Sequence, residues 1–433
     1  MPQLQLVAEL PSHSEPAWSV TFNPTRNLLA SCSTDRSIRL FSYILPSSES
    51  GNGIPSSSDS KPVFSLNKVI STDHKRTVRS IAWAPDGKTL ASGSFDSTVG
   101  VWEEVIPSSD DEDDEDDQEG IYRPATSGNE GIEGREEKEW ECVTTLEGHE
   151  SECKSVAFSS DGALLASCSR DKSVWVWEVQ PDADFECIAV MMEHSQDVKS
   201  IAWHPHEEIL ASASYDSHIH LAFDDPDSDW TIFQKLHPRL PATPLTLSPD
   251  SAPSLISALI PSKEERDADA QLDVPPLEED ETVWSLAFSP DGSYLASGGD
   301  LGGIRIWKRQ GNQPDSQWVE ILHLAVHSRS IFSLAWSPSP NTEKDDVSSD
   351  VRDLGLLASA GGDGKIVVFR ITSGGTENGG ISMKPVAAVK EAHGVSDVNS
   401  IGWCIRDDKK GLGMLSSAGD DGSVKVWRIV SED

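Results

Sequence analysis

Three residue types that act together in many hydrolases lie close to one another in one part of the chain. His149 precedes Asp171 by 22 residues, and Ser167 lies between them. A serine hydroxyl becomes a nucleophile when a histidine accepts its proton and a carboxylate orients that histidine. Arg170 adds a positive charge beside the aspartate. The segment at 168–177, CSRDKSVWVW, therefore suggests an active-site loop, with a ligand-binding loop and a plain turn between strands as the alternatives.

The same set of residues recurs, which weakens the case for catalysis. In the first four copies a histidine precedes the turn aspartate by 22 residues. Several separate nucleophile triads in one chain are implausible, so we interpret the set as structural. Three complete copies, each with a tryptophan, are His74, Ser92, Asp96 and Trp102; His149, Ser167, Asp171 and Trp177; and His393, Ser417, Asp421 and Trp427.

Seven copies of a longer pattern carry this set. Each has a short apolar element, such as RSIAW at 79–83, followed by a segment such as ASGSFDSTVGVW at 91–102. Alternating runs rich in Val, Ile, Trp and Phe, separated by Asp-Gly and Ser-x-Asp turns, predict three β-strands. A fourth strand is predicted in the connecting segment, as at 140–146. The chain is therefore predicted to be all-β, with four strands per unit.

This pattern, with a histidine near the start and Asp…Trp near the end of each unit, resembles the WD-repeat (WD40) family. The resemblance implies a seven-bladed β-propeller, formed by residues 1–433 as a single domain. It also implies a hydrogen-bonded His–Ser–Asp–Trp network that pins the first strand of a blade to the second and third. The last copy lacks a fourth strand, and a spare strand at 4–10 precedes the first copy. We expect this N-terminal strand to complete the seventh blade and close the ring.

Four copies depart from the pattern. Copies one, four and six have Phe41, Phe223 and Phe369 near the place of the tryptophan. Copy five has Glu279 in place of the histidine, and its Asp300 is shifted by one position. We expect these blades to be held less firmly than the three complete ones.

The net charge of −37 limits the ligands that the protein can bind. Such a chain repels nucleic-acid phosphates and anionic lipid, so neither is expected as the main partner. Residues 108–141 alone contribute 12 net negative charges, centred on DDEDDEDD at 110–117. This block is expected to be a solvated, disordered loop. The sequence shows no signal peptide and no apolar run of bilayer length, so we expect no membrane association.

Five segments rich in Ser, Pro, Gly, Asp or Glu interrupt the repeats. We expect them to be exposed and largely mobile loops, at places where a blade tolerates an insertion. They cover residues 46–61, 105–139, 237–280, 339–354 and 371–383.

The six cysteines are scattered, with no CxxC pair and no Cys/His cluster at metal-binding spacing. Cys32 and Cys168 occupy one repeated strand position, and Cys142 and Cys187 occupy another. Cys153 stands where other copies have valine. Repeated strand positions indicate packing, so neither a metal nor another cofactor is expected. Reduced thiols fit the cytosol, or the nucleus, as the location.

Exposed positions that differ from copy to copy are the candidate binding residues. Two such positions ring one mouth of a propeller: the residue that opens the first strand, and the residue before the turn aspartate. Copies two to four place cations there, which we call the basic arc, whereas copies five, six and one place aromatic residues there, which we call the aromatic arc. Arginine and aromatic residues are typical of binding hot spots, and arginine pairs well with a carboxylate. The candidates are Arg170, Arg79, Lys154, Lys199, Tyr215, Trp18, Trp284 and Phe332.

The phrases at 76–103, 152–178 and 193–217 resemble the WD-repeat family of cytosolic iron–sulfur protein assembly, in a fungal form with acidic insertions. The resemblance implies a docking scaffold without catalysis and without a cluster of its own. Such a scaffold belongs to a targeting complex and helps to transfer clusters to cytosolic and nuclear apoproteins. The implied partners are a small assembly factor, a helical-repeat adaptor, an iron-only-hydrogenase-like cluster carrier and the client apoproteins. The family's functional arginine falls on Arg170.

Two other classes of function stay open, because a propeller serves many functions. One is a different interaction scaffold, such as a ubiquitin-ligase substrate receptor or a chromatin peptide reader. A basic arc suits lysine-rich histone tails poorly. The other class is an enzyme, which only the repeated His–Ser–Asp set supports.

Overall fold

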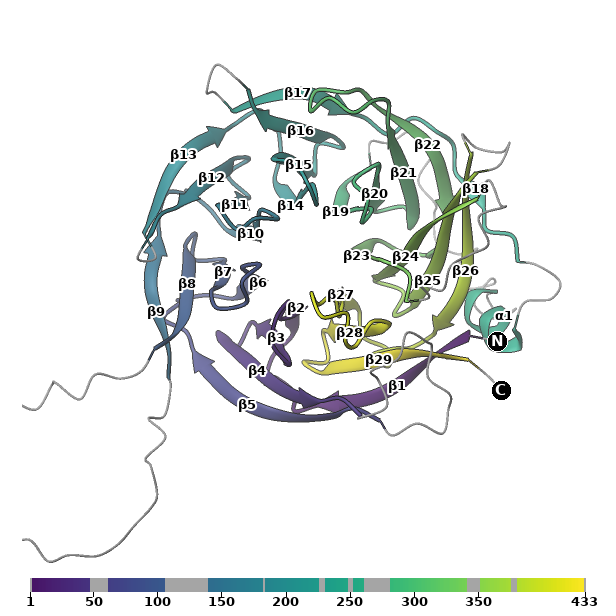
Figure 1. Cartoon of the computed structure of the whole chain (residues 1–433), viewed down its shortest axis with the longest axis horizontal. Helices are drawn as coiled ribbons and strands as arrows, with labels where there is room; N and C mark the ends of the chain where they lie inside the picture. Colours follow the sequence, from purple (N-terminus) through teal and green to yellow (C-terminus); the bar gives the residue numbers. More distant parts are fainter. Residues whose placement is uncertain are drawn as a thin grey trace, which may run out of the picture.

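Seven β-sheets, arranged as blades around a ring, make up the protein (Figure 1). Six blades have four strands and one has five, so the predicted all-β, seven-bladed propeller is confirmed. No helix in the described part of the chain is long and apolar enough to cross a membrane. The computed structural model describes residues 2–46, 61–105, 139–181, 184–225, 230–247, 252–260, 281–340, 351–374 and 380–431.

Each blade runs from an inner strand near the ring centre to an outer strand at the rim (Figure 1). Blades one to three are β2 (Ala17–Phe22), β3 (Leu28–Ser33), β4 (Ser37–Ile44) and β5 (Val63–Ser71); β6 (Val78–Trp83), β7 (Leu90–Ser94), β8 (Val99–Val105) and β9 (Glu139–Leu146); and β10 (Cys153–Phe158), β11 (Leu164–Ser169), β12 (Val174–Val179) and β13 (Phe185–Met191). Blades four and five are β14 (Val198–Trp203), β15 (Ile209–Ser214), β16 (Ile219–Asp224) and β17 (Trp230–Leu236); and β19 (Val283–Phe288), β20 (Tyr294–Gly299), β21 (Gly303–Arg309) and β22 (Trp318–Ala325). Blade six is β23 (Ile331–Ser337), β24 (Arg352–Gly361), β25 (Ile366–Ser373) and β26 (Ile381–Val389).

Blade seven joins the two ends of the chain. Its strands are β27 (Val398–Trp403), β28 (Met414–Gly419), β29 (Val424–Ser431) and, outermost, β1 (Pro2–Leu10). Strand β1 pairs antiparallel with β29, from Leu4 opposite Ile429 to Leu10 opposite Val424, and the two strands lie side by side in Figure 1. The prediction that the N-terminal strand closes the ring is confirmed.

Small residues at the centre of the second strands let neighbouring blades pack closely. All six residues of β11, LLASCS, are buried. Because an alanine has no side chain beyond Cβ, a blade can approach its neighbour at this register without leaving a gap. The central alanines of the second strands, each fully buried, are Ala30, Ala91, Ala166, Ala211, Ala296 and Ala358.

A serine in the first strands links neighbouring blades at five of the seven junctions. The Oγ atom of Ser80 accepts a hydrogen bond from the backbone N–H of Val156, in blade three, at 3.2 Å. The same bond closes the ring between blades seven and one, where Ser400 Oγ accepts from the Val20 N–H at 3.3 Å. The serine of the repeated RSIAW element therefore connects inner strands that have no ladder between them.

Four of the five segments expected to be loops contain regular structure, although 105–139 does so only at its two end residues, where β8 ends and β9 begins. Within 237–280, β18 (Thr243–Pro244) pairs parallel with β22 as a fifth strand, and α1 (Pro253–Leu259) buries Leu255 and Ala258 beside β26. Strand β24 begins within 339–354, and β25 and β26 reach into 371–383. The loop prediction is wrong for these parts, because their apolar side chains pack on blades five and six. Residues 47–60, 106–138, 248–251, 261–280, 341–350 and 375–379, which include the acidic block at 110–117, lie outside the described residues.

Candidate functional site

The recurring His–Ser–Asp–Trp set meets inside each complete blade, and blade three shows the arrangement. The Nδ1 atom of His149 lies 2.9 Å from Asp171 Oδ2, and its Nε2 atom lies 2.8 Å from Ser167 Oγ. Because a carboxylate only accepts, Nδ1 carries the proton and Nε2 accepts from the serine hydroxyl. The indole N–H of Trp177 donates to the same Ser167 Oγ at 3.2 Å. Two strands and two connecting segments are thus joined in one network.

The carboxylate of Asp171 stays ionised within this network. Burial opposes ionisation, but the hydrogen bonds from His149 and Ser173 outweigh it and lower the pKa of Asp171 well below its ordinary range. Its Oδ1 atom accepts from the backbone N–H of Ser173 at 2.9 Å, and Oδ2 accepts from the N–H of Glu150 at 2.9 Å. These bonds tie the turn before β12 to the segment before β10.

Ser167 is not accessible as a nucleophile. It is fully buried, with 0% exposure, and its hydroxyl is bonded to both His149 and Trp177. A catalytic serine has to meet a substrate carbonyl, so this geometry favours fastening of the blade over catalysis. The His–Asp pair recurs at 2.8 to 3.2 Å in six blades: His13–Asp35, His74–Asp96, His149–Asp171, His194–Asp216, His327–Asp363 and His393–Asp421.

The other two complete copies have the same geometry. Their histidine-to-serine distances are both 2.8 Å, and so are their tryptophan-to-serine distances. The residues are His74, Ser92, Asp96 and Trp102 in blade two, and His393, Ser417, Asp421 and Trp427 in blade seven.

The tryptophan position differs in three blades. Phe41 and Phe369 occupy it in blades one and six, in the register of the tryptophans. In blade four the strand pairing places Ala222 there, and Phe223 is the next residue, near this position as expected. The constant spacing of six residues from the turn aspartate, Asp216, likewise leads to Ala222.

A buried ionic network replaces the histidine in blade five. Glu281, only 7% exposed, accepts from the backbone N–H of Leu301 at 3.0 Å and from the Arg305 guanidinium at 3.1 Å. Arg305 also donates to Glu320 at 2.6 Å. The predicted substitute, Glu279, lies outside the described residues. In the described part of the blade, Glu281 takes the structural place of the histidine.

Four of the six cysteines are buried in packing positions, whereas Cys142 is half-buried and Cys187, contrary to the packing expected for it, is exposed. Cys32, Cys153 and Cys168 are fully buried. Burial raises the pKa of Cys32 and of Cys153 to about 12, so these thiols stay protonated. A thiol must lose its proton to bind a metal. Among the residues that the structure describes, no group of three or more His, Cys, Asp or Glu side chains could hold a metal ion.

The residues that open the seven inner strands lie at one mouth of the ring, and a β-bulge is the reason. In every blade the pairing between the first and second strands skips one residue, which is always this one. A bulge redirects a side chain out of the regular ladder. The skipped residues are Trp18, Arg79, Lys154, Lys199, Trp284, Phe332 and Asn399.

Cations and aromatic rings contact one another around this mouth. The basic arc of blades two to four meets the aromatic arc at both of its ends, because Arg79 covers Trp18 and Lys199 covers Trp284. Such contacts contribute about 0.5–2 kcal/mol each, depending on exposure. The distances to ring centres are 4.8 Å for Arg79 over Trp18, 4.1 Å for Lys154 over Phe95, 4.9 Å for Lys199 over Trp284 and 5.3 Å for Lys199 over Tyr215.

Two carboxylates that the sequence analysis did not select lie among these cations. Glu152 accepts from Lys154 at 2.6 Å and from Arg76 at 3.0 Å, and Asp197 accepts from Lys199 at 3.3 Å. Burial opposes ionisation of Glu152, but the bonds from both cations outweigh it and lower its pKa. Each acid precedes its lysine by two residues, a repeated spacing that could have revealed it. The basic arc is therefore partly neutralised.

Arg170 differs from the other predicted cations of the mouth because it is exposed, and its guanidinium makes no hydrogen bond within the described residues. Its side chain is 57% exposed. The nearest carboxylate oxygens, of Glu152 and Asp197, lie at 3.8 and 3.9 Å, beyond hydrogen-bond length. No described residue accepts a hydrogen bond from this guanidinium, while the Arg170 backbone N–H donates to the Glu152 carbonyl at 2.9 Å. This backbone bond fixes the turn that carries Arg170, and the guanidinium can bind a carboxylate through two parallel hydrogen bonds.

The mouth is apolar at blades five and six and acidic at blade seven. The rings of Trp284 and Phe332 meet edge to face at 5.4 Å. In blade seven, Asn399 donates to Asp420 at 2.7 Å. Burial and the charge of Asp420 raise the pKa of Asp397 beside it. A ligand that bridges the mouth would therefore meet cations, aromatic rings and carboxylates in turn.

A known repeat family matches the chain in seven places. The profile described as "WD domain, G-beta repeat" matches residues 4–42, 64–103, 140–178, 185–221, 277–308, 318–370 and 384–428. These seven matches correspond to the seven blades.

Three fungal relatives are similar over nearly the whole chain, and each bears the name "Probable cytosolic iron-sulfur protein assembly protein 1". The relative from Cryptococcus neoformans var. neoformans serotype D is 70% identical over 442 residues, which covers 100% of both chains. That from Mycosarcoma maydis is 42% identical over 99% of this chain and 93% of the relative. That from Aspergillus flavus is 33% identical over 98% of both.

Proposed function

Because the chain belongs to the WD-repeat family and, within it, to the family of cytosolic iron–sulfur protein assembly protein 1, we propose that it is a docking scaffold. It works in cytosolic iron–sulfur protein assembly and helps to transfer clusters to cytosolic and nuclear apoproteins as part of a targeting complex. It holds partners without catalysing a reaction and carries no cluster itself. The buried serine of each His–Ser–Asp set and the protonated, buried thiols support this.

The mouth binds the partners, and Arg170 is the anchor. The observation that carries this proposal is the exposed guanidinium with unused donors, fixed by its turn between two carboxylates at 3.8 and 3.9 Å. A C-terminal or side-chain carboxylate of a partner takes up these donors. An apolar group beside it packs on Trp284 and Phe332. Arg79, Lys154, Lys199, Tyr215 and Trp18 shape the mouth through their cation–π contacts.

The partners that suit this mouth are proteins with an acidic or carboxylate-terminated segment. We assign to this class the small assembly factor, the helical-repeat adaptor, the iron-only-hydrogenase-like carrier and the client apoproteins. The net charge of −37 leaves the mouth as a local cationic site on an acidic surface. Long-range repulsion therefore disfavours acidic partners in any other orientation.

Charge reversal at Arg170 tests the proposal. Loss of a hot-spot arginine contact costs about 2 kcal/mol or more, so Arg170→Glu should weaken capture of a partner by about 30-fold or more. The matched control is Lys384→Glu, which makes the same charge change at an exposed site on β26, an outer strand. Proteins recovered with each tagged variant from the native cell would be compared by mass spectrometry.

Iron–sulfur assembly factors and apoproteins should be recovered with the unchanged protein and the control and lost with Arg170→Glu. Equal recovery with all three would show that Arg170 is not the anchor. Recovery of ubiquitin-ligase subunits or chromatin peptides in place of assembly factors would overturn the proposed function itself.

A further inference from the structure

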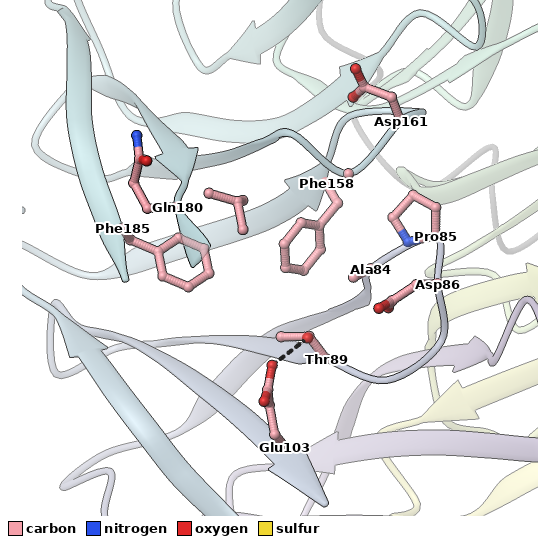
Figure 2. A pocket seen from close by; sticks show the side chains of 11 residues that line it. Ala84, Pro85, Asp86, Thr89, Glu103, Phe158, Asp161, Gln180 and Phe185 are labelled. Atoms are coloured by element: carbon pink, nitrogen blue, oxygen red, sulfur yellow. Dashed lines mark hydrogen bonds between the residues drawn. The ribbon is translucent and has the colours of Figure 1, made fainter. Parts of the chain in front are cut away.

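A cleft opens between blades two and three, at the end of the strands away from the mouth. It has a volume of about 240 Å³ and lies between the turn after β6 and the turn after β10. In Figure 2 the rings of Phe158 and Phe185 line one side, and the carboxylates of Asp86, Glu103 and Asp161 surround the space. The proposed function does not use this cleft.

Smaller aromatic side chains in blade three account for the cavity. In blades two and four, an aromatic ring at the end of the first strand packs edge-on against a tryptophan of the outer strand. The pairs are Trp83 with Trp140 and Trp203 with Trp230, both at 5.6 Å. Blade three has Phe158 and Phe185 at these two positions. Two phenyl rings fill less space than two indoles, so a hollow is left.

The neighbouring cleft, between blades one and two, is filled by an arginine of this chain. Arg26 donates from Nε and Nη2 to the Gly87 carbonyl, at 3.2 and 2.9 Å, and from Nη1 to Glu104 at 3.0 Å. Its guanidinium lies 5.6 Å from the ring centre of Trp140. Asn23 donates to the same carbonyl at 2.8 Å. This cleft is therefore built to hold a guanidinium against an aromatic ring.

The cleft between blades two and three has the same plan but lacks the arginine. Strand pairing places Gly87 where blade one has Arg26, and Ala84 where blade one has Asn23. The Gly162 carbonyl stands in the place of the Gly87 carbonyl, and no described side chain donates to it. Phe185 takes the place of Trp140. The carbonyl and the aromatic ring of an arginine contact are therefore present without their ligand, while Val179 stands in the place of Glu104.

Arginines fill other clefts on this end of the ring as well. Between blades seven and one, Arg406 donates to the Thr25 carbonyl at 3.2 Å. Between blades four and five, Arg309 donates to Glu207 at 2.6 Å. A guanidinium between two blades is thus a recurring feature of this fold's own packing.

The charge of the lining selects a cation. It contains three carboxylates and neither lysine nor arginine. Asp161 accepts from the Ser159 hydroxyl at 2.6 Å and from the Ala163 N–H at 3.0 Å, and these bonds lower its pKa. Glu103 accepts from Thr89 at 2.6 Å (Figure 2). An acidic rim around phenyl rings, with no lysine or arginine in the lining, suits a side chain with an apolar stem and a cationic head.

We propose that this cleft binds an arginine side chain of a partner protein. Its stem and the face of its guanidinium lie on Phe158 and Phe185. Its N–H groups bond Asp86, Asp161 and the Gly162 carbonyl, as Arg26 bonds Glu104 and the Gly87 carbonyl in the next cleft. The site is independent of the mouth, has the opposite charge preference, and allows a second partner to bind at the same time.

Peptides that differ in one residue test the proposal on the full-length chain. The probes are blocked Gly/Ser peptides with a central arginine or with citrulline, its neutral isostere, and binding is followed by NMR titration. The arginine peptide should bind at least about tenfold more tightly, because one charge-assisted bond is worth about 1.4 kcal/mol or more. No binding of the arginine peptide at millimolar concentration, or equal binding of both peptides, would overturn the proposal.

Two variants locate the binding. Phe185→Trp should fill the cleft and abolish binding. We expect this variant to fold normally, because Trp140 and Trp230 occupy the same position in blades two and four. Asp86→Asn keeps the acceptor for the Lys88 N–H and should weaken binding. Arg170→Glu should leave it unchanged, so failure at the mouth and failure at the cleft are distinguishable. If the arginine peptide still binds Phe185→Trp, its binding site is not this cleft. If the unchanged chain forms a dimer that Phe185→Trp abolishes, the cleft is occupied by a second copy of the chain and not by a partner's arginine.

Discussion

Replacing His149 with alanine tests whether the His–Ser–Asp–Trp network fastens blade three. The side chain is bonded to Ser167, Asp171 and Ser173 at 2.8, 2.9 and 3.1 Å. Its removal leaves a buried hydroxyl without an acceptor and a carboxylate with one donor fewer, at about 1–3 kcal/mol for each unsatisfied group. Because Asp171 keeps its backbone donors, we expect a total loss of about 2–4 kcal/mol in the stability of the blade.

Hydrogen exchange measured by mass spectrometry resolves this loss blade by blade. A factor of ten in an opening equilibrium corresponds to about 1.4 kcal/mol. Amides of β10 to β12 should therefore exchange about 30- to 700-fold faster, where exchange follows local opening. The matched control is Trp177→Phe, which removes one hydrogen bond and should cost only about 1 kcal/mol. Phe41 and Phe369 show that the fold accepts phenylalanine at this position.

Unchanged protection of blade three in His149→Ala would refute the reasoning, and so would equal effects of the two variants. A uniform increase in exchange over all seven blades would also contradict it. That pattern would mean that the ring opens only as a whole, so that no network belongs to one blade.

Two further predictions concern acid and ring closure. The pKa values of the turn aspartates are lowered in the fold. For Asp421, burial raises the pKa, but the hydrogen bonds from His393 and Ser423 outweigh this effect and lower the pKa to about 2. The stabilisation that these aspartates contribute is complete above the unfolded-state pKa, near 3.9, and is lost as the pH falls below it. The free energy of unfolding, measured by urea unfolding with tryptophan fluorescence, should therefore fall in this pH range, and less steeply in Asp421→Asn. A free energy of unfolding that does not change with pH would contradict the prediction. Leu10→Ala, at a 4% exposed site on β1, should lower the free energy of unfolding by about 2–5 kcal/mol. Leu6→Ala, at a 38% exposed site, is the control, and equal losses in the two variants would argue against closure by β1.

The fold could be predicted because its signal repeats. Each blade carries the same strand lengths and turns, so seven weak patterns reinforce one another, and the count of strands left only β1 to complete blade seven. The parts that were missed have no repeat to reveal them. Helix α1 has two turns and buries only Leu255 and Ala258, too few residues to show a helical period. Strand β18 has two residues and depends on β22 for its existence.

The candidate site was predictable in position but not in contacts. The repeat alignment found the residues at the mouth, because a bulge recurs at the same place in every blade. It did not select Glu152 and Asp197, which neutralise two of the lysines, although each acid precedes its lysine by the same two residues; only the side-chain geometry shows that the pairs form. Nor could it show the cleft between blades two and three, which arises from residues that are smaller than their counterparts elsewhere.

Both proposed binding sites rely on groups whose hydrogen-bonding capacity the packing leaves unused. Most cations at the mouth are already engaged, Lys154 with Glu152 and Lys199 with Asp197, so they shape the site more than they select a ligand. The Arg170 guanidinium is left with free donors, and at the other end of the ring the Gly162 carbonyl is left without the side-chain donor that Gly87 receives. These two positions prefer opposite charges and face opposite ways. A ring with such ends can hold an acidic and a basic segment together, which is what a scaffold must do to bring two proteins into contact.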